Sequence, residues 1–372
     1  MNAHNKKRHD AMGVAGGMMT MRAPRSASLE GRPAAVGAGS ADAHPFLRNK
    51  RLMILGGTGS LGQALLAYLQ EHNEITVFSR DEEKQWRTKN RYPSERLKCI
   101  IGDIRDRDSL LSALQSRRPE VIINAAALKQ ITTCEYFPSQ AIETNVVGVQ
   151  RLVDAVNRTS GVEAVIGIST DKACQPVNVY GMSKAIQERI YIEANLHARG
   201  TRFLCVRYGN VLESRGSVIP LFKEQIAKGG PITITVPQMT RFLLSLRQSV
   251  ELIMAAYCFG LPGDVWIPKV SSATVADIAQ VLLQGRHVPI TTIGIRPGEK
   301  IHETLVSEEE VFRTIEFQGY YVIEPVLPEL RAQHVHQRHG AVSPVRFQRY
   351  ASTDNVLSQE ALREFLATQQ VI

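Results

Sequence analysis

Six short apolar segments, separated mostly by stretches with a helical period, dominate the chain between residues 51 and 207. They cover residues 51–55, 75–78, 97–101, 121–125, 164–168 and 202–207. Apolar runs of this length predict buried strands, whereas residues 179–197 show the longer period of a helix. Strands that alternate with helices predict a parallel, doubly wound sheet with right-handed crossovers, which is an α/β Rossmann-like fold.

The pattern changes after Asn210. Shorter strands are expected at 232–235, 264–267 and 291–295, and helices at 248–257 and 274–284. These elements predict a smaller lobe that covers the carboxyl edge of the sheet, where open α/β sheets bind their ligands. We therefore divide the chain into a Rossmann domain over residues 50–210 and, over 211–372, mainly the smaller lobe with a C-terminal extension.

The net charge of +8 belongs largely to the N-terminal part of the chain. Residues 1–50 hold eight Lys/Arg against three Asp/Glu, which leaves about +3 for the other 322 residues and does not favour a nucleic-acid partner. Residues 1–49 show no period and no long apolar run, so we expect a disordered or artefactual tail and no signal peptide. No segment of about eighteen apolar residues is present, which predicts a cytoplasmic protein without a membrane partner.

Neither the cysteines nor the histidines predict a metal site. The five cysteines lie far apart without a C-x-x-C pair and are expected to be free thiols of a reducing compartment: Cys99, Cys134, Cys174, Cys205 and Cys258. Residues 331–345 are rich in His, Gln and Arg and are predicted to form an exposed loop. Its three histidines are too loosely spaced to suggest metal ligands.

A glycine-rich turn follows the first predicted strand and opens a helix. Gly56, Gly59 and Gly62 are spaced three apart, with Thr58, Ser60 and Leu61 between them. Glycines in this place allow a tight turn and a close approach of the backbone to a pyrophosphate, which then rests on the helix N-terminus. The pattern predicts a dinucleotide site.

The end of the second strand bears on which dinucleotide is bound. The strand ends in Ser79 and Arg80, followed by Asp81, where NAD enzymes usually carry an acidic residue. A guanidinium at this position can pair with the 2′-phosphate of NADP, whereas a carboxylate would repel it. NADP is therefore favoured, and Asp81 leaves NAD open.

Candidate catalytic groups follow the fifth strand within sixteen residues. Thr170, Asp171 and Lys172 come at its carboxyl end, and Tyr180 and Lys184 are four apart, which places them on one face of the next helix. A lysine ammonium beside a tyrosine lowers the pKa of the phenol and makes it a plausible general base. An isolated Y-x-x-x-K pair is weak, but here it follows a dinucleotide site.

Together these motifs resemble the extended short-chain dehydrogenase/reductase superfamily. Within it the chain is most similar to the soluble UDP-N-acetylglucosamine 4,6-dehydratases of polysaccharide biosynthesis, especially the C5-inverting type. The resemblance runs from about residue 51 to 329. It rests on seven segments in order: 56–62 (GGTGSLG), 124–130 (NAAALKQ), 169–172 (STDK), 180–184 (YGMSK), 207–211 (RYGNV), 239–242 (MTRF) and 296–300 (RPGEK).

The resemblance implies an enzyme that uses internal redox chemistry on UDP-N-acetylglucosamine. Tyr180 would take the C4 hydroxyl proton while C4 gives a hydride to NADP, which later returns it to C6. Lys172 would remove the C5 proton and would need a depressed pKa, and a protonated Asp171 would release the C6 hydroxyl as water. Thr170 would hold the C4 oxygen and Lys184 the ribose.

Further contacts are implied with less specific residues. Asp103 and Ile104 would lie against the adenine, although Asp103 could instead cap the next helix. Ala125 and Ala126 would line the cofactor, and Lys129 would reach cofactor or substrate or remain a solvated loop lysine. The UDP diphosphate would contact Asn210, Arg241 and Arg296, unless the two arginines form interface ion pairs.

Three alternatives or extensions stay open at this point. A UDP-sugar 4-epimerase or 4-ketoreductase needs Tyr180 and Lys184 but has no use for the Asp171/Lys172 pair. A non-catalytic NADP-binding regulator would usually lack the tyrosine or lysine. The resemblance further suggests a homo-oligomer, either a dimer through paired helices or a hexamer.

Overall fold

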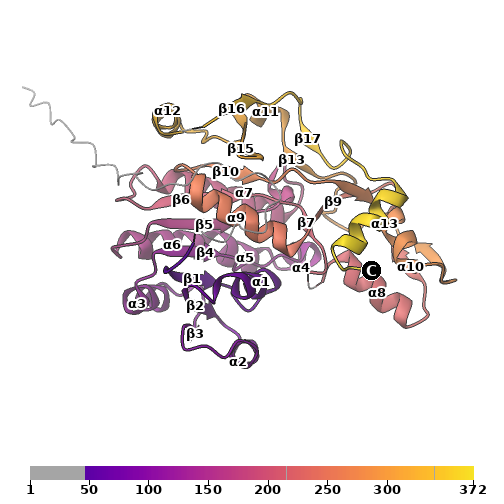
Figure 1. Ribbon diagram of the computed structural model, residues 1–372, viewed down its shortest axis with the longest axis horizontal. Coiled ribbons are helices and arrows are strands. Elements are labelled where there is room, and N and C mark those ends of the chain that lie inside the picture. The colour runs from indigo at the N-terminus through magenta and orange to yellow at the C-terminus, as the bar shows by residue number, and fades with distance from the viewer. Residues whose placement is uncertain (1–46, 215, 339) are drawn as a thin grey trace, which may run out of the picture.

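The computed structural model describes residues 47–214, 216–338 and 340–372. The N-terminal tail expected over residues 1–49 therefore lies almost wholly outside the described residues. Within them, the main sheet has ten strands in the order β16-β14-β15-β10-β6-β5-β4-β1-β2-β3. The strands from β3 to β10 pair in parallel, and β15, β14 and β16 extend the sheet antiparallel. The predicted α/β fold is confirmed (Figure 1).

The strands of the main sheet are short and mostly buried. The apolar run of β5, for example, is buried from Ala164 to Gly167, as expected for a parallel sheet that is covered on both faces. The strand bounds are β1 Arg51–Leu55, β2 Glu74–Ser79, β3 Leu97–Ile101, β4 Val121–Asn124, β5 Ala164–Ile168, β6 Arg202–Val206, β10 Val265–Ile267, β14 Thr314–Phe317, β15 Tyr320–Ile323 and β16 Val342–Pro344.

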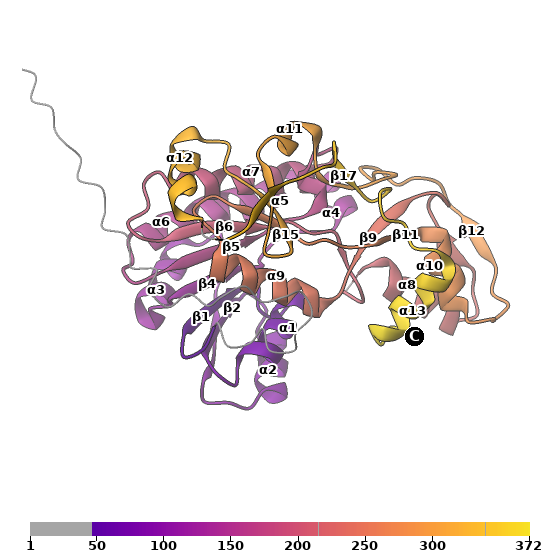
Figure 2. The ribbon, with the colours of Figure 1, turned by 45° about the horizontal axis from the view of Figure 1, so that its top comes forward.

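Helices cover both faces of this sheet. On one side α1 packs against α9, and on the other α6 packs against both α3 and α7 (Figures 1 and 2). Local signals set their ends: Asp81 and Asp106 cap α2 and α3, and Ser245 begins α9 with a capping box. The bounds are α1 Ser60–Leu69, α2 Glu82–Arg91, α3 Arg107–Arg117, α6 Gly148–Asn157, α7 Val179–Ala194 and α9 Leu246–Phe259.

A smaller lobe with its own apolar core lies at one end of the molecule. Phe222, Ile278 and Leu366 are buried in this core, and Figures 1 and 2 show α8, α10 and α13 side by side there. The strand expected at 264–267 and the helix expected at 248–257 do not belong to this lobe: β10 pairs with β6 in the main sheet, and α9 packs on that sheet against α1. The lobe elements are β7 Asn210–Val211, α8 Val218–Ala227, β8 Ile232–Ile234, β9 Thr240–Leu244, β11 Ser272–Thr274, α10 Val275–Leu283, β12 Ile290–Thr292 and α13 Gln359–Thr368.

The exposed loop predicted over 331–345 is wrong over the part that the structure describes. Helix α12 (Pro328–Gln337) occupies its beginning and β16 its end. His334 is buried, with Nε2 2.9 Å from the Pro262 carbonyl and Nδ1 3.5 Å from Asp264 Oδ1. The polar composition hid this helix because His334 within it, and Arg338 directly after it, pair with the buried Asp264; Arg338 Nη2 lies 2.8 Å from Asp264 Oδ1.

The remaining elements are short and lie between those named above. They are α4 Ile131–Tyr136, α5 Pro138–Ile142, the π-helical turn η2 Glu143–Val147, the 3-10 turn η3 Asp171–Ala173, β13 Thr304–Val306, α11 Glu308–Val311 and β17 Tyr350–Ala351. Across the described ranges, each helix is too short or too polar to cross a membrane.

Candidate active site

A cavity of about 670 Å³ opens at the carboxyl ends of the parallel strands, between the main sheet and the smaller lobe. The structure brings nearly all sequence-predicted site residues to its wall. These are Gly56, Thr58, Gly59, Ser60, Leu61, Gly62, Ser79, Arg80, Asp103, Ile104, Ala125, Ala126, Lys129, Thr170, Lys172, Tyr180, Lys184, Asn210, Arg241 and Arg296. Asp171 is the exception: it is fully buried behind Lys172.

The glycine turn has the shape that a dinucleotide needs. Gly56 has φ +73°, and a Cβ on it would lie 2.8 Å from the Ala126 nitrogen. A Cβ on Gly62 would lie 2.2 Å from the Gly57 oxygen, so α1 can approach the turn only with glycine there. Helix α1 has no side-chain cap and no acidic residue in its first turn. Its N-terminus therefore suits an anion such as a pyrophosphate.

At the end of β2, the acidic residue Asp81 serves as the N-cap of a helix. Asp81 caps α2 by accepting a hydrogen bond from the Lys84 nitrogen at 2.9 Å, and its other oxygen pairs with the Lys84 ammonium. The pKa of Asp81 is lowered by these hydrogen bonds. Ser79 Oγ accepts from Gln85 Nε2 at 3.0 Å, and the charged residues on the cavity wall here are Arg80, Asp81, Lys84 and Asp103. The sequence analysis missed Lys84.

Asp103 lies at the same rim and does not cap the following helix. The cap of α3 is Asp106, whose Oδ1 accepts from the nitrogens of Asp108 and Ser109. Asp103 instead binds Arg105 through Nε at 2.9 Å and Nη2 at 2.7 Å, and Arg80 Nη1 is 3.5 Å away. The helix-cap alternative is therefore excluded.

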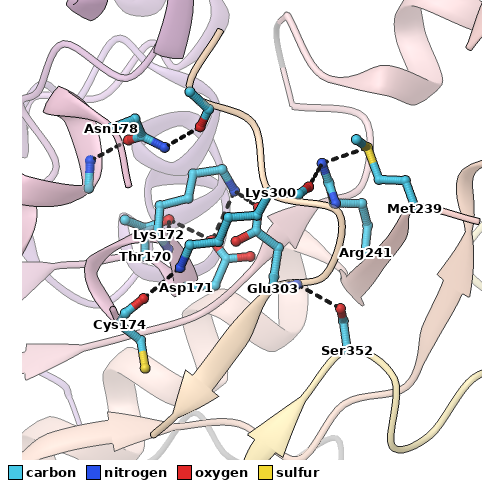
Figure 3. Close-up of polar contacts among 12 residues, drawn as sticks. Thr170, Asp171, Lys172, Cys174, Asn178, Met239, Arg241, Lys300, Glu303 and Ser352 are labelled. Carbon is cyan, nitrogen blue, oxygen red and sulfur yellow. Dashed lines mark hydrogen bonds and ion pairs between the residues drawn. The ribbon is translucent and has the colours of Figure 1, made fainter. Parts of the chain in front are cut away.

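The turn after β5 gathers a hydroxyl, two carboxylates and an ammonium. The Thr170 hydroxyl donates to Asp171 Oδ1 at 2.8 Å, and the same oxygen is 3.0 Å from Lys172 Nζ. Lys172 Nζ also lies 3.2 Å from Glu303 Oε1, a carboxylate supplied from just before β13 (Figure 3). Sequence reasoning missed Glu303, because it stands 131 residues after Lys172 in the chain.

Lys172 does not have the depressed pKa that we expected. Burial acts to lower the pKa of its ammonium, but the charges of Asp171 and Glu303 outweigh burial and raise the pKa well above the ordinary lysine value. In this state the residue is a cation held between two carboxylates. A role as base therefore requires a partner that takes its proton.

Tyr180 and Lys184 share one face of α7, as predicted, but their electrostatics differ from the prediction. Lys184 is 2% exposed and its Nζ donates to Gln187 Oε1 at 2.5 Å; burial lowers its pKa to about 8. Burial also raises the pKa of Tyr180 to about 12, against the opposing effects of the Lys172 charge and a hydrogen bond with Thr170. The expected lowering of the Tyr180 pKa is wrong here because burial of the phenol outweighs the charge and the hydrogen bond that act to lower it.

Residues 296–303, which we call the closing segment, are hydrogen-bonded to the stretch between the turn after β5 and α7. Asn178, the cap of α7, donates from Nδ2 to the Gly298 oxygen at 2.7 Å, and Lys300 Nζ donates to the Cys174 oxygen at 2.7 Å. Arg241 donates from Nη2 to the Lys300 oxygen at 3.0 Å and from Nη1 to the Ile301 oxygen at 3.1 Å. Figure 3 shows these contacts around Lys172. Arg241 thus positions the closing segment, and its predicted contact with a diphosphate stays a prediction.

Two buried polar groups support the site from behind. Asn145 bonds both the nitrogen and the oxygen of Leu128 at 2.9 Å and the Ser183 hydroxyl at 2.9 Å, which ties the loop after β4 to α7. Arg207 is paired with Glu188 at 2.6 Å and with Glu310 at 2.7 Å. Arg207 opens the segment 207–211 of the resemblance, but neither Asn145 nor Arg207 was predicted to hold these contacts.

Several buried polar atoms at the cavity lack a partner among the described residues. Thr144 Oγ1, Asn210 Oδ1 and Ser217 Oγ belong to residues that line it, and Asp171 Oδ2 and Glu303 Oε2 lie beside it. Buried polar atoms are usually hydrogen-bonded, so their concentration here indicates that a polar ligand completes the site.

The comparisons with known proteins agree with this geometry. Residues 52–325 match the family described as "Polysaccharide biosynthesis protein". The chain belongs to this family. It is 44% identical to the UDP-glucose 4-epimerase of Rickettsia prowazekii over 285 residues, which cover 74% of this chain and 83% of the relative. It thus falls among the nucleotide-sugar epimerases and dehydratases.

Solved structures place this family member in the same fold group. The X-ray structure of Pen from Bacillus thuringiensis matches with a TM-score of 0.81 at 31% identity, covering 88% of this chain and all of Pen. DesIV, a dTDP-glucose 4,6-dehydratase from Streptomyces venezuelae with NAD and TYD bound, matches with a TM-score of 0.62 at 20% identity. It covers 77% of this chain and 96% of DesIV, and the likeness shows the fold alone.

Proposed function

We propose that this family member is a UDP-N-acetylglucosamine 4,6-dehydratase that forms a UDP-4-keto-6-deoxy-N-acetylhexosamine, with inversion at C5. One observation carries the proposal. Lys172, which lines the cavity with Tyr180, forms an acid–base cluster with Asp171 and Glu303, whose carboxylate oxygens lie 3.0 and 3.2 Å from its Nζ. Oxidation at C4 alone has no use for such a cluster, whereas elimination across C5 and C6 needs both a base and an acid.

The residues present fit a nicotinamide dinucleotide, and NADP is proposed. The glycine turn and α1 would hold the pyrophosphate, Lys184 the nicotinamide ribose and Asp103 the adenine side. Arg80 and Lys84 would supply cations to the 2′-phosphate of NADP; here Arg80 lies 3.5 Å from Asp103 and Lys84 pairs with Asp81, which also caps α2. When bound, the dinucleotide would accept a hydride from the sugar and return it, so no net oxidant is consumed.

Each catalytic side chain then has a defined task. Tyr180 removes the proton of the C4 hydroxyl, whose oxygen the Thr170 hydroxyl positions. The 4-ketone acidifies the C5–H bond, and Lys172, once neutral, takes that proton. Asp171 would enter this step protonated, having taken up a proton from the medium, and would supply that proton as the C6 oxygen leaves as water. Thr170, whose Oγ1 is 2.8 Å from Asp171 Oδ1, lines the cavity beside it.

The other half of the cavity suits the nucleotide part of the substrate. It is lined by Leu221, Phe222 and Ile234 of the smaller lobe, which offer apolar surface to a base. Asn210, with a buried unpartnered Oδ1, and the exposed Arg296 at the rim are placed for the ribose and diphosphate. Lys129 is exposed on the cofactor side of the cavity.

The proposed enzyme is a homo-oligomer. Tyr136 and Phe137 at the end of α4, and Met182 and Ile186 on α7, expose apolar side chains. Neighbouring helices with exposed apolar residues suit the predicted pairing of helices between two copies. Light scattering of the purified protein would test this.

A UDP-sugar 4-epimerase is the second candidate, favoured by the Rickettsia relatives that carry that name. NMR of the purified protein with UDP-N-acetylglucosamine in D₂O, without added cofactor, separates the two. A dehydratase gives a C6 methyl group and deuterium at C5, and ring couplings report the C5 configuration. An altered C4 centre with an intact C6 hydroxyl supports the epimerase. Tyr180→Phe should give neither product.

A further inference from the structure

Lys172 is held more firmly as a cation than a base can be. Its Nζ is 3.0 Å from Asp171 Oδ1 and 3.2 Å from Glu303 Oε1, and these two carboxylates are 0% and 2% exposed. An ammonium so close to two buried carboxylates binds its proton tightly. Before the amine can accept a proton from carbon, its own proton must go to a neighbour.

Glu303 is the better placed of the two acceptors. Asp171 Oδ1 already accepts from both Thr170 and Lys172. Glu303 contacts Lys172 through Oε1, and its Oε2 is buried without a partner among the described residues. Asp171 Oδ2 is likewise without a partner among the described residues, but Asp171 Oδ1 has two donors whereas Glu303 Oε1 contacts Lys172, so Glu303 has fewer hydrogen bonds to give up when it accepts the proton.

The position of Glu303 does not depend on Lys172. Its nitrogen donates to Ser352 Oγ at 2.9 Å, and the closing segment before it is fixed by Arg241 and Lys300. The carboxylate is therefore presented to Lys172 by a segment anchored on both sides, as Figure 3 shows.

We propose that Glu303 is a positioning residue that takes the Nζ proton of Lys172 and so converts Lys172 into the neutral base for C5. One Nζ–H bond breaks, one Oε1–H bond forms, and no electron pair leaves either residue, so the charge of the cluster stays the same. The coupling of the two residues stands on their geometry alone. Its use at C5 rests on the proposed function.

Other charged and titratable groups face this pair. Asp171 adds negative charge and Arg241 positive charge at Lys172, and Tyr180 feels the Lys172 charge across the cavity. His302, next to Glu303, is bound through Nδ1 to the Thr240 hydroxyl at 2.8 Å. None of these groups changes between wild type and a Glu303 variant, so a matched comparison isolates the carboxylate.

A substrate-free experiment tests the coupling. The protein is trace-labelled with acetic anhydride between pH 6 and 11, and acetylation of Lys172 is followed by mass spectrometry. Glu303→Gln should move the labelling midpoint to lower pH and increase labelling at pH 9 at least tenfold, since one of two adjacent charges is lost. Glu299→Gln, whose carboxylate accepts from the Arg296 nitrogen in the same segment, should leave the midpoint in place.

An unchanged labelling midpoint in Glu303→Gln would overturn the coupling. So would a change of Lys172 acetylation by the same factor at every pH, because such a change reports only how exposed the amine is. If Glu303→Gln does not fold, Glu303→Asp decides: its more distant charge should give an intermediate midpoint, and a wild-type midpoint overturns the proposal. Absence of turnover with UDP-N-acetylglucosamine would instead contradict the proposed function and would not affect the labelling result.

A second measurement tests the use of the pair at C5. During turnover in D₂O, the rate of deuterium entry at C5 should be nearly independent of pH between 7 and 9 in the wild type, because the proton moves within the pair. In Glu303→Gln the proton must leave to solvent, so the rate should rise about tenfold per pH unit below the Lys172 midpoint. Equal slopes in the two proteins would contradict the proton transfer.

Discussion

Replacing Lys184 by methionine should stabilise the ligand-free protein at neutral pH. Lys184 is 2% exposed, and burial lowers its pKa to about 8 from the unfolded value of 10.5. Below pH 8 the folded state must carry a charge that its surroundings disfavour, which costs about 3 kcal/mol. Methionine removes that cost but also the hydrogen bond to Gln187, worth about 1 kcal/mol, so the net gain is about 2 kcal/mol.

Urea unfolding without nucleotide at several pH values measures this gain. The folded pKa is depressed, so the penalty of the wild type is full below pH 8 and disappears as pH rises toward 10.5; the advantage of Lys184→Met should shrink over the same range. Lys89→Met, on the exposed face of α2, is the matched control and should show no such change. A destabilised Lys184→Met protein at pH 7, or an advantage that persists at pH 10, would refute the reasoning.

Three further substitutions have expected outcomes. Glu310→Gln should lower the free energy of unfolding by about 3 kcal/mol at pH 7, because Arg207 holds the pKa of this buried carboxyl at about 2 against the effect of burial. Urea titrations should show the full loss above pH 4.5 and a decline of the loss toward pH 2. The substitution Glu309→Gln, at an exposed position, is the control. Gly62→Ala should weaken NADP binding at least tenfold by calorimetry, since its Cβ would meet the Gly57 backbone, whereas Gly230→Ala, in open space, should bind normally. Arg80→Ala should weaken NADP about tenfold and leave NAD unchanged; equal losses for both would place the 2′-phosphate elsewhere.

Local patterns were sufficient to predict the six parallel strands from β1 to β6 and to bring the predicted site residues after them to one cavity, but not to predict β14, β15 and β16 or the place of β10 in the same sheet. Each parallel strand is a short apolar run, and the residues after it reach the same sheet edge because the strands are parallel. Gly56 and Gly62 could be recognised because a turn and a close approach restrict those positions to one residue type.

Contacts between distant parts of the chain were not predictable in this way. The pKa of Lys172 is raised by the distant Glu303 as well as by its neighbour Asp171, and the pKa of Lys184 is lowered by its burial in the packed helix α7. Neither of these pKa values can be inferred from the spacing of apolar residues along the chain. Helix α12 was missed for a related reason, since polar residues such as His334 and Arg338 are buried there through pairing with Asp264.

The Arg207 cluster makes the order of synthesis matter for this protein. Arg207 follows β6, just past the middle of the chain, but its partner Glu310 and the Leu305 oxygen that it bonds at 2.9 Å are made about a hundred residues later. A nascent chain that ends within the smaller lobe therefore holds a buried guanidinium with only part of its ligands, and it lacks Glu303 as well. The turn after β5, which carries Lys172, can form all its contacts only when β13 and α11 have been translated. A Rossmann domain truncated before them would leave the ribosome without a complete candidate active site.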